Sequence, residues 1–143
     1  MKETYEQYKK TSKKYILLFV IVFVVSTAHY MFITPLSSRD DYGVLAIALI
    51  SFAVCFTGSI IYGAFSYVYT KKIIIPYVVL LAALWLGAAV SFIFYTIIFP
   101  RRSGLDMVFI YAFDEMLLTF FAPLSALLTK CVRTFFEKRN NQS

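Results

Sequence analysis

The sequence predicts an all-α membrane protein with four transmembrane helices in an up-down antiparallel bundle. First, 60% of the 143 residues are apolar and only 15% are charged, against about 25% charged residues in soluble domains. Second, four apolar stretches are each long enough to cross a hydrocarbon core of about 30 Å as a helix; they cover about residues 15–33, 44–68, 73–99 and 105–129. Third, the connections are short, so each span should run antiparallel beside its predecessor.

Basic residues gather on one side of this predicted bundle. Five lysines precede the first span, two follow the second, and four Lys or Arg residues follow the fourth. The only basic residues in the predicted external loops are Arg39, Arg101 and Arg102. Because short cytoplasmic loops are rich in Lys and Arg, both termini are expected in the cytoplasm. The whole chain, 1–143, is thus a single integral membrane domain with a basic N-terminal segment (1–14) and a basic tail (130–143). These ends predict contact with anionic lipid rather than with nucleic acid.

At the first span, lysines are followed by a short apolar run from Ile16 to Val25 and then by Ser26-Thr27-Ala28, a pattern that also resembles a cleaved signal peptide. The apolar run continues to residue 33, which favours a retained span. A Pro-, Ser- and Gly-containing external loop is expected at residues 34–43, a tight cytoplasmic turn at Lys71-Lys72, and a second external loop at residues 100–104. Pro76 falls in the first turn of the third span, where proline is tolerated.

The second and third spans carry small residues at every fourth position. These helix-packing residues are Ser51, Cys55, Ser59 and Gly63 in the second span, and Ala83, Gly87 and Ser91 in the third. Residues four apart share one helical face, and small side chains let helices approach closely in lipid. We expect the two stripes to face each other across the Lys71-Lys72 turn. A pore lining or a subunit interface is the alternative. Trp85 in the third span is expected to be a buried packing residue.

Asp114 and Glu115 lie near the middle of the fourth apolar stretch. A charge at that depth costs from about 2.5 kcal/mol to 10 kcal/mol or more, so the pair needs protonation, a partner or a wet cavity. Tyr111 lies within one helical turn of both acids, and His29, the only histidine, is expected at a similar depth in the first span. Together these four residues predict an intramembrane polar site, such as a proton relay or a cation site.

Plainer interpretations of the same residues stay open. His29 can bond a backbone carbonyl at the interface, and the acids can serve only as hydrogen-bonding groups between helices. A fourth span that starts nearer Met116 would leave both acids in the external loop. Because adjacent helical residues diverge by about 100°, one acid should face the bundle and the other its flank or a neighbouring subunit. Pro123 should interrupt the backbone bonding of the fourth span and form a kink or hinge.

No catalytic motif or phosphate-binding loop is present in the sequence. One histidine and two cysteines that are far apart in the sequence, Cys55 and Cys131, predict neither a metal site nor a disulfide. We therefore expect no catalytic residues, no cofactor and no enzymatic activity.

The residues Ile61-Tyr62-Gly63-Ala64-Phe65-Ser66, followed by Thr70-Lys71-Lys72 at the cytoplasmic turn, resemble the YwlA-type family of small membrane proteins from Gram-positive bacteria. Its members are likewise multi-span, with Tyr-Gly and a later Ser before a basic turn. The family has no assigned activity, so the resemblance implies a location in the bacterial plasma (inner) membrane and offers no functional residues.

Two functions follow from these observations. The leading interpretation is a non-enzymatic membrane module that works by helix association, either as a homo-oligomer or as a subunit, immunity protein or defence-type effector with a membrane-protein partner. The alternative is a small proton- or cation-coupled transporter or channel that uses Asp114 or Glu115. A lipid-handling enzyme would need turnover that depends on the same acids.

Overall fold

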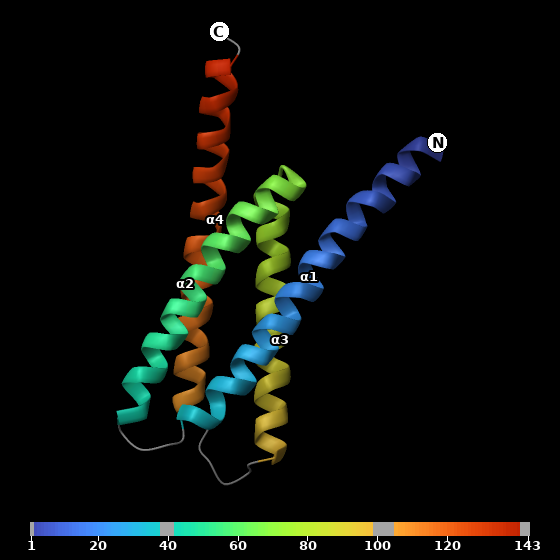
Figure 1. Ribbon diagram of the computed structural model, residues 1–143. Helices are drawn as coiled ribbons and strands as arrows, with labels where there is room; N and C mark the ends of the chain where they lie inside the picture. The colour runs from blue at the N-terminus through green and yellow to red at the C-terminus, as the bar shows by residue number, and fades with distance from the viewer. Residues whose placement is uncertain (1, 38–41, 99–104, 141–143) are drawn as a thin grey trace.

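Four α-helices make up the described part of the chain (Figure 1). The computed structural model describes residues 2–37, 42–98 and 105–140, with side chains for residues 9–33, 45–98 and 111–140. The helices are α1 (Lys2–Ser37), α2 (Tyr42–Thr70), α3 (Ile74–Ile98) and α4 (Leu105–Asn140). Each contains a segment long and apolar enough to cross a membrane: Lys9–Ile33, Leu45–Thr70, Ile74–Ile98 and Tyr111–Asn140. The prediction of four helices able to span a membrane is confirmed.

The first and last helices extend beyond the apolar stretches that predicted them. α1 begins at Lys2 and continues through Pro35 to Ser37, where the sequence predicted a loop. Pro35 cannot donate a backbone bond to the carbonyl four residues before it, and α1 ends two residues later. α4 continues to Asn140, and its exposed last turns carry an Arg133–Glu137 ion pair at 2.7 Å. In Figure 1 the N-terminal part of α1 and the C-terminal part of α4 project from the same end of the bundle. The rest of the predicted external loops, at residues 38–41 and 99–104, lies outside the described residues.

The turn between α2 and α3 is as short as the sequence predicted. α2 ends at Thr70 and α3 begins at Ile74. Lys71 adopts a left-handed backbone conformation, with φ of 58°, and its amide donates to the Tyr67 carbonyl at 2.8 Å. This is a common way for a helix to satisfy its last carbonyls and reverse direction. Pro76 lies in the first turn of α3, and its carbonyl accepts a 2.7 Å bond from the Tyr62 hydroxyl of α2.

The small-residue stripes pack, but not against each other. All seven stripe residues are buried, yet α2 packs mainly on α4 and α3 mainly on α1. A Cβ at Gly63 would overlap the carbonyl oxygen of Ala122 in α4, and a Cβ at Gly87 would overlap the Ser26 hydroxyl in α1. The prediction that the stripes of α2 and α3 face each other is therefore wrong. Small residues permit close approach, but they do not specify which helix approaches.

The same pairing decides which residues form the core and which form the outer surface. A core of buried apolar residues from α1, α3 and α4 fills the bundle centre, and it comprises Val22, Leu80, Ala83, Leu84 and Ala122. Trp85, by contrast, is 66% exposed, so the prediction that it is buried is wrong. It belongs to an outer surface of large apolar side chains on all four helices, as expected where lipid tails replace water.

Candidate functional site

Asp114 is enclosed at the meeting point of three helices. Its side chain in α4 is 0% exposed. The Ser51 hydroxyl of α2 donates to its Oδ2 at 2.5 Å, and Nε2 of His29 in α1 lies 3.2 Å from the same oxygen. With its proton on Nε2, the imidazole donates to the carboxylate. These contacts join α1, α2 and α4 through one carboxylate oxygen, and they place both acids inside a helix rather than in the external loop.

His29 contacts a second side chain of α2. Its Nε2 lies 3.6 Å from Sγ of Cys55 and 3.3 Å from Oγ of Ser51. Ser51 and Cys55 are four residues apart and therefore share one helical face. The face that the sequence identified as a packing stripe thus also supplies two members of the polar cluster, which we define as His29, Ser51, Cys55 and Asp114.

The two carboxylate oxygens of Asp114 differ in their hydrogen bonding. Oδ1 is buried and has no hydrogen-bond partner among the described residues. Buried polar atoms nearly always have a partner, because an unmade bond to a charged group costs more than about 1–3 kcal/mol. An ionised Asp114 would therefore carry one hydrogen-bonded oxygen and one buried oxygen without a partner among the described residues.

Glu115 does not join the polar cluster by any recorded contact. Its residue is 8% exposed, against 0% for Asp114, and adjacent helical positions diverge by about 100°. Both acids are buried. Asp114 faces His29 and Ser51, and the expectation that Glu115 faces the flank of the bundle or a neighbouring subunit stays a prediction.

Tyr111 is connected to His29 through the ring of Tyr30 in α1. Its ring is 4.3 Å from the ring of Tyr30, and the Tyr30 ring is 5.7 Å from the His29 ring. Both tyrosines are buried, at 6% and 1% exposure. The two tyrosine rings pack beside the polar cluster. Direct contact of the Tyr111 hydroxyl with a carboxyl group stays a prediction.

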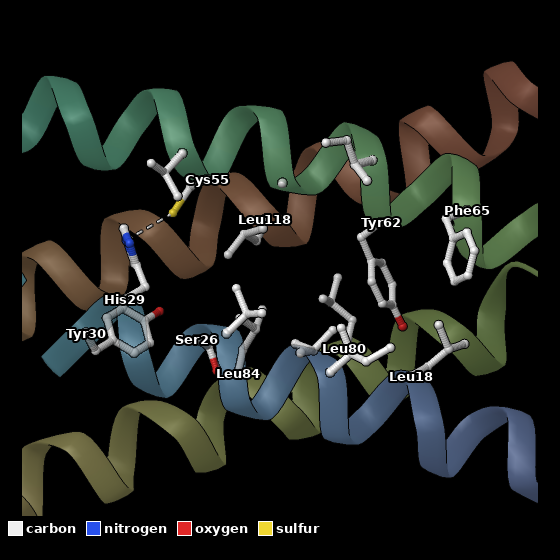
Figure 2. A pocket seen from close by; sticks show the side chains of 16 residues that line it. Leu18, Ser26, His29, Tyr30, Cys55, Tyr62, Phe65, Leu80, Leu84 and Leu118 are labelled. Atoms are coloured by element: carbon white, nitrogen blue, oxygen red, sulfur yellow. Dashed lines mark hydrogen bonds between the residues drawn. The ribbon is translucent and has the colours of Figure 1, made fainter. Parts of the chain in front are cut away.

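A cavity of about 280 Å³ adjoins the cluster (Figure 2). It lies between α1 and α2, and Leu80 and Leu84 of α3 and Leu118 of α4 also line it. Figure 2 shows His29 and Cys55 at one end of this cavity and Tyr62 and Phe65 at the other. Several lining side chains are about half exposed on the outer surface, including Ile21, Val25 and Ile61. The cavity is therefore apolar along its length, open at its side and polar at one end.

Pro123 lies inside α4, and the structure records one continuous helix through it. The neighbouring Ser125 hydroxyl donates to the Ile60 carbonyl of α2 at 2.8 Å, which ties this part of α4 to its packing partner. A hinge at Pro123 stays a prediction.

Three side chains of the cluster are chemically able to hold a metal ion. His29, Cys55 and Asp114 each offer one ligand atom, and these atoms lie within 4.8 Å of one another. The sequence analysis counted one histidine and two distant cysteines and expected no metal site. The missed signal was the depth along the helices. Ser51 lies about as far from the start of α2 as Asp114 lies from the start of α4 and His29 from the end of α1. Cys55 follows Ser51 by about one helical turn.

No protein-family model, curated protein or solved structure matches this chain. The resemblance to the YwlA-type family accordingly stays a prediction.

Proposed function

We propose that this protein is a small cation-coupled transporter or channel in which Asp114 binds the cation within the four-helix domain. One observation carries the proposal: Asp114 is completely buried, and its Oδ1 has no hydrogen-bond partner among the described residues. Burial of an ionised group without a partner is strongly unfavourable. A cation bound to the Asp114 carboxylate would neutralise its charge and reduce this unfavourable term, so the site is arranged for an occupant.

The surroundings of Asp114 support a cation rather than a purely structural role. A carboxylate that only joined helices would be expected to use both oxygens in hydrogen bonds. Here Ser51 and His29 both approach Oδ2. Intramembrane acids that face a bundle interior commonly mark ion pathways.

We further propose that the four spans form an up-down bundle in a bacterial plasma membrane, with both chain ends in the cytoplasm. The distribution of Lys and Arg supports this orientation. Anionic lipid headgroups would then contact the basic segments at the cytoplasmic face.

The helix-association interpretation has less support. Its evidence in the sequence was the pair of small-residue stripes, and both are used inside the chain, through Gly63 against α4 and Gly87 against α1. Asp114 also points into the bundle, where it contacts α1 and α2. A homo-oligomer or a membrane-protein partner therefore stays a prediction. No particular surface of the described residues is identified as the interface.

Flux measurements in proteoliposomes test the proposed function. Purified wild-type protein and the Asp114→Asn variant would be reconstituted, and the efflux of sodium, potassium, zinc and protons would be followed with ion-sensitive dyes. Asparagine keeps the size of the side chain and an acceptor for Ser51 but removes the charge. Cation flux should occur with the wild type and be lost in Asp114→Asn, with both proteins eluting identically in size exclusion.

Glu115→Gln is the matched control because it neutralises the adjacent carboxyl outside the cluster. It should retain cation flux. The proposal is refuted if correctly assembled Asp114→Asn transports as well as the wild type. It is also refuted if the wild type carries protons alone or carries no ion.

A further inference from the structure

Three donor atoms of different chemistry converge in the polar cluster from three different helices. They are an imidazole nitrogen of His29 in α1, the thiol sulfur of Cys55 in α2, and a carboxylate oxygen of Asp114 in α4. Cys55 and Asp114 are buried, and the side chain of His29 is 14% exposed. Mixed nitrogen, sulfur and oxygen donors suit zinc-like transition metals, whereas sodium, potassium and magnesium prefer oxygen ligands.

Two of the three separations between these atoms are close to those around a tetrahedral zinc ion. Bonds of about 2.3 Å to sulfur and about 2.0–2.1 Å to nitrogen or oxygen place sulfur about 3.6 Å and oxygen about 3.4 Å from nitrogen. In the structure, Nε2 of His29 lies 3.6 Å from Sγ of Cys55 and 3.2 Å from Oδ2 of Asp114. The third separation, between Sγ of Cys55 and the Asp114 carboxylate, is at most 4.8 Å. A tetrahedral zinc ion requires a sulfur–oxygen separation of about 3.6 Å.

We propose that His29, Cys55 and Asp114 bind a divalent transition metal of the zinc class. This inference names the cation of the proposed transport function and rests on that proposal for its role in transport. Cys55 binds as the thiolate, so its proton leaves to water as the metal enters. His29 binds through Nε2 as the tautomer that carries its ring proton on Nδ1, whereas without the metal the proton on Nε2 is donated to Asp114.

Two features of the surroundings fit a bound metal. The Ser51 hydroxyl donates to Asp114 at 2.5 Å and so orients the carboxylate, as hydrogen bonds to metal-bound carboxylates commonly do. The cavity borders His29 and Cys55, which leaves a fourth coordination position accessible from that side. Three protein ligands with one open position are typical of sites that exchange a ligand, whereas structural zinc sites are closed by four.

Cobalt substitution tests the site directly, with full-length protein in detergent after removal of metals by a chelator. Cobalt bound to a thiolate has a charge-transfer absorption band in the near ultraviolet, and zinc should displace it. The wild type should show this band, and Cys55→Ser should lose it. The matched control is Cys131→Ser, which removes the other, exposed cysteine and should keep the band.

Affinity measurements complete the test. Asp114→Asn should bind cobalt at least about tenfold more weakly than the wild type. Circular dichroism and size exclusion check that Cys55→Ser and Asp114→Asn fold. A band that persists in folded Cys55→Ser, or that disappears in Cys131→Ser, overturns the assignment, as does failure of the wild type to bind either metal.

The flux assay separates this inference from the proposed function. Zinc and cobalt binding with no flux of any ion would refute transport and leave the metal site standing. Sodium or potassium flux that depends on Asp114, without zinc or cobalt binding, would refute the metal site and leave transport standing.

Discussion

The same substitution at two glycines of α2 should have opposite effects on stability. At Gly63, a Cβ would overlap the carbonyl oxygen of Ala122 and lie 2.9 Å from Cβ of Ser125. Both neighbours belong to the helix α4 and neither is the end of a flexible chain, so Gly63→Ala must push α2 and α4 apart. At Gly58, a Cβ would meet nothing within 4 Å.

The magnitude follows from two separate terms. Replacing glycine by alanine in a helix favours the helix by up to about 1 kcal/mol, and this gain is common to both positions. Forcing an extra carbon into a close-packed contact costs about 1–3 kcal/mol, and only Gly63→Ala incurs that cost. The free energies of unfolding of the two variants should therefore differ by about 1–3 kcal/mol, with Gly58→Ala the more stable.

Reversible unfolding in mixed micelles of a mild detergent and dodecyl sulfate provides the measurement, with circular dichroism reporting helix loss. Wild type, Gly58→Ala and Gly63→Ala would be titrated side by side. If Gly63→Ala proves as stable as Gly58→Ala, the close approach of α2 to α4 is not a feature of the folded protein, and the pairing argument fails.

Two further substitutions test the polar cluster and the helix extension in the same unfolding assay. Ser51→Ala removes a donor to the buried carboxylate and should lower the free energy of unfolding by about 1–3 kcal/mol; Ser59→Ala, equally buried but bonded only to a carbonyl of its own helix, should cost less. Equal losses in the two serine variants would contradict a special role for Ser51. Glu137→Gln breaks an exposed ion pair and should leave the unfolding midpoint unchanged, since exposed pairs contribute little; a clear shift would show that the end of α4 is packed.

The elements of the fold that follow from local properties could be predicted from the sequence. Hydropathy summed over about 20 residues identifies a span whatever its neighbours are, and α4 begins at Leu105 as predicted. The depth of a residue also follows from its position along a helix. For this reason, the sequence placed His29 and Asp114 near each other, and the structure brings them to 3.2 Å.

The predictions that failed concern the rotation and partner of a helix. The stripe of α2 was expected to face α3, but Gly63 packs against Ala122 of α4. Trp85 was expected to be buried and is 66% exposed. A helix that is apolar all round has no clear inner face, so composition alone does not decide which side points to the lipid.

The sequence by itself determined that this chain forms four helices long and apolar enough to span a membrane, with an acidic pair deep in the fourth, because length and hydropathy are properties of each segment alone. Only the tertiary structure decided that α1, α2 and α4 meet at Asp114, and that Cys55 joins His29 there. That convergence depends on which backbones approach within a few ångströms. The approach depends on how small residues on one helix fit against residues on another. This fit involves two helices, so it cannot be derived from the sequence of one helix alone.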